Sequence, residues 1–251
     1  MKDLFNTYIC IACRLDSNRL PRKALRLVDD IPVIELLVTR LLTLFNPSNI
    51  IICTSNESIN EPLRLVSQKY NIGFFSGDKL DVMGRFINAS CYLKHPKSVV
   101  RVTGDNPLTD VHLMYDMISN HNAGSYEYTF TSAVPRGLRC EVIDFEYLKD
   151  LHTRIVNTSN TEYMTHYLKL DTSKKLHFLP DISWNNLTFT IDTQDQLEFV
   201  SKVVAASPNK YLSTTDELVD TTYMLMGKHY TNVPPEAHPL DLSSFRFTRR
   251  T

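Results

Sequence analysis

Residues 8–25 read YICIACRLDSNRLPRKAL, and this stretch decides how the chain begins to fold. An apolar run at residues 8–13 predicts a short buried strand. The polar loop that follows it carries four cations, Arg14, Arg19, Arg22 and Lys23. In α/β folds, ligands bind in the loops after the carboxyl ends of the strands. A basic loop at that place indicates a polyphosphate site, with a solvated cationic turn as the alternative.

Strand and helix patterns alternate along the rest of the chain. We expect further strands at residues 49–54, 72–75 and 98–102, and helices at residues 31–45, 61–70, 81–93 and 111–121. This order predicts an α/β fold with a parallel sheet covered on both faces. After residue 125 the rhythm changes. There we expect strands at 126–131, 138–143 and 187–191, and helices at 145–155, 161–170, 194–205 and 214–226.

Composition describes an ordinary globular chain of 251 residues with 43% hydrophobic residues and a net charge of −1. A near-neutral chain has no global field that would favour nucleic acid or an anionic membrane. No apolar run approaches the roughly 20 residues of a membrane helix, and the N-terminus does not resemble a signal peptide. The five cysteines are odd in number and scattered. They predict reduced thiols, and the chain is expected to be cytoplasmic, without nucleic-acid or membrane partners.

Two acidic residues stand where predicted strands end, Asp105 after residues 98–102 and Asp192 after residues 187–191. If both strands belong to one sheet, both carboxylates can converge above its carboxyl edge. Mg²⁺ prefers oxygen ligands and usually takes one or two carboxylates together with substrate phosphates. Each aspartate has a structural alternative as a helix cap or an Asx turn. The sequence has no cluster of histidines and cysteines at the spacing of zinc ligands, no nucleophilic triad, no GxGxxG motif and no DxD triplet.

A resemblance to a known family rests on eight segments in order. Residues 14–25, RLDSNRLPRKAL, resemble the Arg-x-Gly-Ser-x-Arg-Leu-Pro-Gly-Lys loop of cytidylyltransferases that activate acidic sugars. The likeness continues through the helix with Pro32-Val33-Ile34, then IIICTSN, GDKLDVMGRF, RVTGDNPLTD, PRGLRCEVIDFEYL, TEYMTHYL and FTIDTQDQLEFV. It covers residues 7 to about 204. The chain thus resembles the spore-coat polysaccharide biosynthesis protein F type, which is related to acylneuraminate and 3-deoxy-manno-octulosonate cytidylyltransferases.

This resemblance implies a nucleotidyltransferase fold of the glycosyltransferase-A type, an α/β/α sandwich with a mixed, mostly parallel sheet. The catalytic residues it implies are Lys23, Arg14, Asp105 and Asp192, of which the two aspartates would hold Mg²⁺. Nucleotide-binding residues would be Arg14, Ser17, Arg19, Lys23, Thr54, Ser55, Gly77, Asp81, Arg85 and Thr103. Acceptor-binding residues would be Arg139, Glu141, Tyr163 and His166. Residues 1–210 would form the nucleotidyltransferase domain, and residues 211–251 a helix and tail packed on the domain or on a partner subunit.

The chain departs from the family pattern at four positions. Asp16 and Arg22 replace two loop glycines, which elsewhere let backbone N–H groups approach phosphate closely. Tyr163 stands where relatives have an acceptor-side histidine, unless His166 substitutes for it. Gly84 stands where the family often has an aspartate. These changes leave the implied triphosphate and metal residues in place and affect mainly the acceptor side.

The resemblance implies an Mg²⁺-dependent cytidylyltransferase that joins CTP to a sugar acid or a small phosphorylated acceptor and releases pyrophosphate. The product would serve surface polysaccharide biosynthesis in a capsule, lipopolysaccharide or spore coat, and family members commonly form homodimers. One alternative is a cytidylyltransferase acting on a phosphorylated amino-acid amide of the phosphoglutamine type, for a capsule modification. Another is a nucleotide-binding paralogue without turnover, motivated by Asp16 and Gly84.

Overall fold

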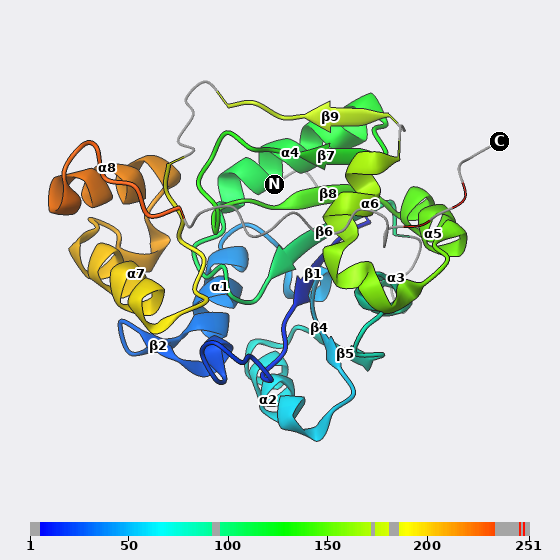
Figure 1. Ribbon diagram of the computed structural model, residues 1–251, viewed down its shortest axis with the longest axis horizontal. Coiled ribbons are helices and arrows are strands. Elements are labelled where there is room, and N and C mark those ends of the chain that lie inside the picture. The colour runs from blue at the N-terminus through cyan, green and yellow to red at the C-terminus, as the bar shows by residue number, and fades with distance from the viewer. Residues whose placement is uncertain are drawn as a thin grey trace.

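A computed structural model describes residues 6–91, 96–171, 174–180, 186–233, 246 and 248. Its main sheet has seven strands in the order β5-β4-β1-β6-β8-β7-β9 (Figure 1). The strands are β1 Thr7–Ala12, β4 Ile50–Ser55, β5 Gly73–Gly77, β6 Ser98–Thr103, β7 Tyr128–Phe130, β8 Glu141–Asp144 and β9 Lys175–His177. Two short strands, β2 Leu27–Val28 and β3 Ile31–Pro32, pair separately.

Eight α-helices occur within the described residues. They are α1 Val33–Leu41, α2 Glu61–Tyr70, α3 Val82–Cys91, α4 Val111–Gly124, α5 Phe145–Arg154, α6 Met164–Leu170, α7 Gln194–Ala206 and α8 Thr215–Met226. Short 3₁₀ helices lie between them, η1 Lys23–Leu25, η2 Pro47–Asn49, η3 Ser58–Asn60, η4 Thr158–Tyr163 and η5 Lys210–Leu212. None of these helices combines the length and the hydropathy that a transmembrane segment needs.

The strand order places the loops after β1 and β6 next to each other. From β1 the chain moves outward through β4 to β5 and then returns to form β6 on the other side of β1. Strand β1 is parallel to both β4 and β6, so these strands share one carboxyl edge. Such a reversal of strand order opens a crevice where α/β proteins bind ligands. Among the strands of this sheet, β8 alone runs antiparallel to its neighbours.

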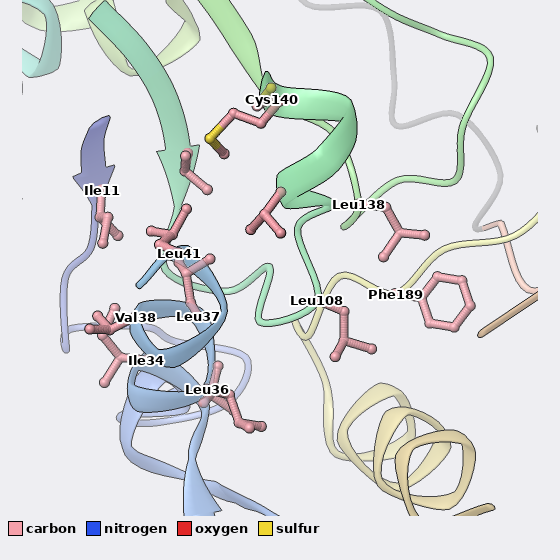
Figure 2. Packing of buried hydrophobic residues seen from close by; sticks show 14 of the residues in the cluster. Ile11, Ile34, Leu36, Leu37, Val38, Leu41, Leu108, Leu138, Cys140 and Phe189 are labelled. Carbon is pink, nitrogen blue, oxygen red and sulfur yellow. The ribbon is translucent and has the colours of Figure 1, made fainter. Parts of the chain in front are cut away.

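Alternating side chains of the strands face two separate cores. On β1, Ile9 and Ile11 join a cluster with α1, α2, α4, α7 and α8, whereas Cys10 joins a second cluster with α3, α5 and α6. Figure 2 shows part of the first cluster, where apolar side chains of α1 lie close to Ile11. This two-sided burial is what a mostly parallel sheet requires, because helices cover both of its faces. The predicted α/β/α sandwich is confirmed.

The prediction of a strand at residues 187–191 is wrong. In the structure this segment is largely buried, but among the described residues it forms one isolated bridge, between Thr188 and Arg136, and belongs to no strand. Its backbone N–H groups form hydrogen bonds with loop residues instead. Phe189 N–H donates to the Arg136 carbonyl at 2.7 Å, and Ile191 N–H donates to the Asp105 carbonyl at 2.9 Å. The sequence pattern cannot distinguish a strand paired in a sheet from a buried segment without strand partners, because both bury the same kind of short β-branched and apolar run.

The other differences lie at the boundaries of elements and in short strands. Strands β2, β3 and β9 were not predicted, and helix α1 begins at Val33 because Ile31–Pro32 pairs as β3. The first part of the predicted helix at 161–170 is the 3₁₀ helix η4. Helix α8 packs against α7, and Tyr223 Oη donates to Asn186 Oδ1 at 3.1 Å. The division at residue 210 stays a prediction, and most of the tail, residues 234–245, lies outside the described residues.

Candidate active site

A cavity of about 400 Å³ opens where β1 and β6 end. Eight of the residues predicted from the sequence line it, namely Arg14, Ser17, Arg19, Lys23, Arg85, Thr103, Asp105 and Asp192. Most of them come from the loop after β1 and from the end of β6 with its following loop. The fold therefore brings the basic loop and both candidate metal carboxylates to one hollow.

Lys23 joins the two aspartates at the edge of this cavity. Its Nζ donates to Asp105 Oδ2 at 2.5 Å and to Asp192 Oδ1 at 2.6 Å, and Arg19 Nη2 lies 3.0 Å from Asp192 Oδ2. Burial alone would lower the pKa of Lys23, but Asp105 and then Asp192 outweigh it, so the pKa lies above its usual range. The lysine thus stays charged and neutralises a pair of carboxylates that would otherwise repel each other.

Local backbone features hold this arrangement in place. Arg22 lies in the left-handed region with φ 52° and ψ 36°, and Lys23 begins η1 directly after it. A non-glycine residue rarely adopts that conformation, which agrees with the glycine in the loop pattern that this segment resembles. Asp192 is placed by the Ile191–Asp105 backbone bond and by α7, which begins with a capping box between Thr193 and Gln196. Gln196 Oε1 also accepts from Asp192 N–H at 2.7 Å.

The two aspartates fit a divalent cation. Both carboxylates already converge on a single cationic atom, Lys23 Nζ, at 2.5 and 2.6 Å. No group of three or more acidic, histidine or cysteine ligands occurs among the described residues. Two carboxylates with room for phosphate oxygens beside them suit Mg²⁺, which seldom occupies a cage made entirely of protein ligands.

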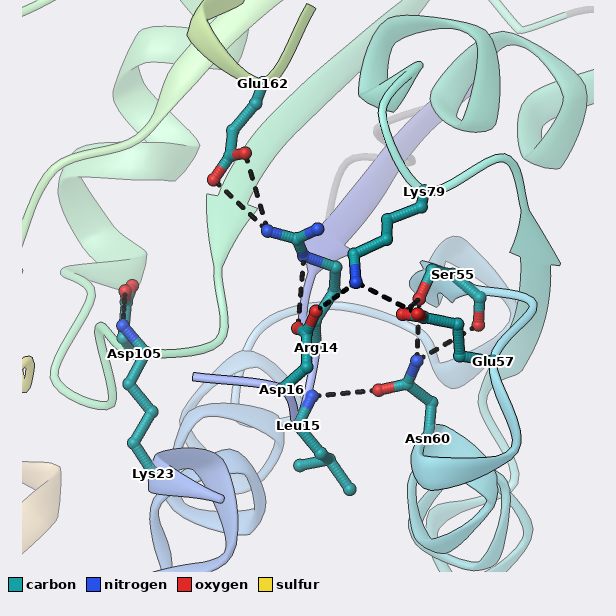
Figure 3. A network of polar contacts seen from close by, with 10 residues as sticks. All are labelled: Arg14, Leu15, Asp16, Lys23, Ser55, Glu57, Asn60, Lys79, Asp105 and Glu162. Atoms are coloured by element: carbon teal, nitrogen blue, oxygen red, sulfur yellow. Dashed lines mark hydrogen bonds and ion pairs between the residues drawn. The ribbon is translucent and has the colours of Figure 1, made fainter. Parts of the chain in front are cut away.

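Asp16 also lines the cavity, and its carboxylate pairs with Lys79 and Arg14. Asp16 Oδ2 lies 2.7 Å from Lys79 Nζ, which is also 2.9 Å from Glu57 Oε1, and Asp16 Oδ1 lies 3.6 Å from Arg14 Nε (Figure 3). Burial alone would raise the pKa of Asp16, but Lys79 and Arg14 outweigh it and lower it below its usual range. The acidic replacement of a loop glycine therefore has two cationic partners, and it ties the loop after β1 to the segment after β5.

Asn60 fixes the same loop from the other side. Its Oδ1 accepts from Leu15 N–H at 2.8 Å, and its Nδ2 donates to Ser55 Oγ at 2.8 Å (Figure 3). Ser55 Oγ donates in turn to Glu57 Oε2 at 3.0 Å. Segments after β1, β4 and β5 are thus joined by one polar network. Ser55, predicted to bind nucleotide, lies in this network and not in the cavity lining.

Arg85 is a buried cation in the wall of the cavity. It is 2% exposed, and its Nε and Nη1 have no hydrogen-bond partner among the described residues. Burial lowers the pKa of Arg85, because the charged form loses its hydration. A buried guanidinium with unmade hydrogen bonds is costly, so this wall of the cavity favours an anionic ligand.

Three more residues predicted around the base and ribose lie outside the cavity lining. Thr54 is buried on β4, and Gly77 packs so closely on Phe75 and Arg85 that a Cβ would lie 2.9 Å from the Phe75 ring. Asp81 caps α3, accepting from Gly84 N–H at 2.8 Å, and it also contacts His152 Nε2 at 2.8 Å. Their nucleotide-binding roles stay predictions.

The Asp81 cap of α3 explains why position 84 has no side chain. A Cβ built on Gly84 would lie 2.4 Å from Asp81 Oδ2 and 2.7 Å from Asp81 Cγ. Thr161 Oγ1 donates to Asp81 Oδ1 at 2.9 Å, so the carboxylate is held in this position by η4 as well as by its own helix. A side chain at position 84 would therefore displace a carboxylate that joins α3, α5 and η4.

A second cavity of about 340 Å³ adjoins the first. Arg139 and Glu141, both predicted to bind the acceptor, line it together with Arg136 and Lys169. Arg139 is anchored through Nη2 to the Ser132 carbonyl at 3.0 Å, and burial followed by the nearby Arg136 lowers its pKa. The cavity thus gathers several cations. Tyr163 and His166, also predicted to face the acceptor, are not among the residues that line either cavity.

Sequence reasoning missed several residues of these cavities. Arg101 lines both of them, and Glu162 lines the first and accepts from Arg14 Nη2 at 3.4 Å. Arg101 carried a usable signal, because it is the one charged residue in the strand sequence SVVRVT, and buried charges require partners. Glu162 and Lys79 carried no such signal, since both lie in polar segments where charged residues are ordinary.

Residues 8–229 match the profile of a protein family described as cytidylyltransferase. The chain belongs to the cytidylyltransferase family. The family predicted from the eight segments and the nucleotidyltransferase class are thereby confirmed. The match begins at the first strand and extends through α8, so it includes both cavities and the helix after residue 210.

Two sequence relatives match part of this cytidylyltransferase. A protein of Methanocaldococcus jannaschii, uncharacterized protein MJ1063, is 28% identical over 158 residues, 63% of this chain and 65% of the relative. The match thus spans slightly less than two thirds of that relative's length. The spore coat polysaccharide biosynthesis protein SpsF of Bacillus subtilis is 29% identical over 164 residues, 63% of this chain and 68% of the relative.

Solved structures with the same fold include a cytidylyltransferase from Leptospira borgpetersenii, with a TM-score of 0.81, 21% identity, and coverage of 88% of this chain and 94% of that one. A CMP-2-keto-3-deoxy-manno-octonic acid synthetase complexed with CTP has a TM-score of 0.62, 13% identity, and coverage of 79% and 98%. Rv0371c from Mycobacterium tuberculosis, in complex with manganese, has a TM-score of 0.53, 11% identity, and coverage of 76% and 95%. At these identities the likeness establishes the fold.

Proposed function

We propose that this cytidylyltransferase transfers CMP from CTP to a small anionic acceptor in an Mg²⁺-dependent reaction that releases pyrophosphate. The observation that carries the proposal is the placement of Lys23 between Asp105 and Asp192 at the mouth of a basic cavity. Family membership supports the cytidylyl group. The solved CTP complex and manganese complex of proteins with this fold are consistent with a nucleoside triphosphate and a divalent cation.

The chain's own residues would act by positioning and by neutralising charge. Asp105 and Asp192 would hold the metal, which, when bound, supplies positive charge to the phosphate oxygens. Lys23, Arg14 and Arg19 would bind the β- and γ-phosphates and stabilise the departing pyrophosphate. An acceptor oxygen forms a bond to the α-phosphorus as the bond to the bridging oxygen breaks, and that electron pair leaves with pyrophosphate. Such a transfer needs little covalent work from the protein.

The second cavity supports an anionic acceptor. It contains Arg136, Arg139 and Lys169, whose charges favour a carboxylate or a phosphate group. A sugar acid would present a hydroxyl for attack, and a phosphorylated amino-acid amide would present its phosphate. The Bacillus subtilis relative, described by its role in spore coat polysaccharide biosynthesis, favours a surface polysaccharide as the destination of the product.

A thermal-shift screen with Mg²⁺ and each of CTP, UTP, GTP and ATP tests the nucleotide, because a ligand that binds only the native state raises its stability. We expect CTP to produce the largest shift. A larger shift with GTP would overturn the cytidylyl assignment. Pyrophosphate release with a panel of sugar acids and phosphorylated amino-acid amides then tests the acceptor class.

Two variants test the site itself. Lys23→Ala and Asp105→Asn should lose most of the turnover while the protein stays folded. Near-normal turnover in either purified variant would reject the assignment. Lys69→Met is a matched control, because Lys69 pairs with Glu35 on the surface away from both cavities.

The two departures that suggested a paralogue without turnover have structural roles. Asp16 pairs with Lys79, and Gly84 makes room for the Asp81 cap. Neither departure removes Lys23, Asp105 or Asp192 from the site, which supports an active enzyme. We also propose a homodimer, and light scattering at working concentration tests it, since a monomer there would reject it.

A further inference from the structure

Arg101 lies at the junction of the two cavities. It is on β6, two residues before the strand ends at Thr103, and its register partner on β8 is Glu141. Arg101 and Thr103 line both the cavity of about 400 Å³ and the adjoining one of about 340 Å³. Of these two side chains, only Arg101 is charged. The guanidinium of Arg101 would therefore contact a ligand group that lies between the two cavities.

Glu141 holds Arg101, and both of its oxygens already accept hydrogen bonds. Its Oε2 accepts from Arg101 Nη1 at 2.7 Å, and its Oε1 accepts from Tyr128 Oη and from Thr165 Oγ1 at 3.0 Å. The residue is 9% exposed, and its three donors come from β6, β7 and α6. The carboxylate therefore orients the guanidinium, and its place in the acceptor cavity is that of a positioning residue.

The rest of the guanidinium has no partner among the described residues. Within the part of the chain that the structure describes, Arg101 Nε is buried without a hydrogen-bond partner, and the one side-chain hydrogen bond of this arginine runs from Nη1 to Glu141. An arginine presents five N–H donors in a fixed fork, so most of its donors remain available. Unmade hydrogen bonds of a partly buried cation are costly, and a ligand oxygen would remove that cost.

We propose that Arg101 is a catalytic residue that donates to a non-bridging oxygen of the α-phosphoryl group. The inference rests on the proposed function, because it assumes that CTP fills the first cavity and the acceptor fills the second. The acceptor oxygen must reach the α-phosphorus to form its bond, so the α-phosphoryl group lies where the cavities meet. Negative charge develops on its oxygens as the acceptor bond forms and the bond to pyrophosphate breaks. A guanidinium already held by Glu141 stabilises that charge without reorganisation.

The first test needs no acceptor. In ³¹P NMR of CTP bound with Mg²⁺, wild-type protein should shift the α, β and γ resonances. Arg101→Gln should lose the α shift and keep the β and γ shifts, while the CTP dissociation constant measured by calorimetry changes less than about fivefold. If Arg101→Gln keeps the full α shift, the inference is overturned. If the wild-type protein shifts no CTP resonance, the proposed function fails instead.

Folding of the variant is controlled in two ways. Arg101→Gln leaves Glu141 without its cation, so the Arg101→Gln, Glu141→Gln double variant removes both charges and should show the same loss of the α shift. Arg64→Gln, an exposed arginine on α2 that stacks on Phe74, is the matched control and should leave all three resonances as in the wild type.

A kinetic test separates catalysis from structure once an acceptor has been found in the panel. Arg101→Gln should lower kcat about 100-fold and leave KM for CTP within fivefold, because its contact strengthens in the transition state. In Arg101→Ala, added guanidinium chloride at millimolar concentration should restore part of kcat, and an equal concentration of NaCl should not. Loss in KM alone, or no response to guanidinium, would reject a catalytic role.

Discussion

Lys23 and Asp105 are 82 residues apart in sequence, and their side chains meet at 2.5 Å. Asp192 joins them at 2.6 Å from the same ammonium. The lysine therefore occupies the place that a divalent cation bound by both carboxylates would take. Under the proposed function, the triphosphate of CTP would give the ammonium a new anionic partner, so metal and nucleotide are expected to bind together.

Lys23→Met should bind a divalent cation more tightly in the absence of nucleotide. Removing one competing unit charge from two carboxylates is expected to raise the affinity about tenfold, which corresponds to about 1.4 kcal/mol. Titration with Mn²⁺ followed by electron paramagnetic resonance measures free and bound ion directly. Lys69→Met serves as the control. An unchanged or weaker Mn²⁺ affinity in Lys23→Met would contradict the competition between the lysine and the metal for the two carboxylates.

Asp16→Gly restores the loop glycine of relatives but should weaken CTP binding. The substitution removes the carboxylate that holds Arg14 and Lys79, and we expect the dissociation constant to rise about threefold, because partly exposed ion pairs contribute little. Asp16→Glu should retain most of the affinity. Exchanging the charges in Asp16→Lys, Lys79→Asp should recover part of it, measured by calorimetry. Tighter binding in Asp16→Gly would show that the acidic side chain simply repels the nucleotide.

Arg22→Gly should stabilise the protein by about 0.5–1 kcal/mol. The arginine adopts φ 52°, a left-handed conformation that costs a side chain more than it costs glycine, although glycine loses more entropy on folding. Urea unfolding measures the change. Arg26→Gly is the matched control because Arg26 has φ −69° and gains nothing from glycine, so stabilisation confined to position 22 is the expected outcome.

Gly84→Ala should destabilise the protein by about 1–2 kcal/mol, although alanine usually favours a helix. The new Cβ would displace Asp81 and break its cap of α3. In an Asp81→Ala background the same substitution should be neutral or stabilising, since no carboxylate stands in its way. Thermal unfolding of the four proteins gives the comparison, and equal effects in both backgrounds would contradict the clash.

His121 should make stability fall in mild acid. It is 2% exposed, its Nδ1 lies 2.9 Å from Thr129 Oγ1, and burial lowers its pKa from the usual 6.5 to about 4. The unfolded chain therefore binds the proton first, so the contribution of neutral His121 is present above pH 6.5 and is lost as pH falls toward 4. The full effect is about 3 kcal/mol. His121→Gln should show a flatter decline of melting temperature over this range than the wild type.

Much of the fold could be predicted from local patterns. Helix α2 occupies the predicted residues 61–70, and strands β1, β4 and β6 lie within a residue or so of their predicted bounds. These elements carry apolar residues at regular spacing, and spacing depends only on the geometry of one element. The two-residue strands β2 and β3 are too short to show a period, so they could not be predicted in this way.

The site was predicted less completely, because its contacts join distant segments. The prediction that Asp105 and Asp192 lie together is confirmed, yet the assumption that Asp192 ends a strand of the sheet is wrong. The two aspartates meet because Ile191 bonds the backbone of Asp105. The acceptor-binding role of Glu141 stays a prediction; Glu141 lines the second cavity, and its carboxylate accepts from three side chains that the sequence did not bring together.

The sequence by itself determined the order of the elements, the basic loop after the first strand and membership of the cytidylyltransferase family. Each of these can be read from short segments and from their order along the chain. Only the tertiary structure decided where Asp16 points and which side chain lies between the cavities. Lys79 reaches Asp16 from the segment after β5, and Arg101 reaches both cavities from within β6. Such contacts arise from the packing of segments far apart in the sequence, which no local pattern records.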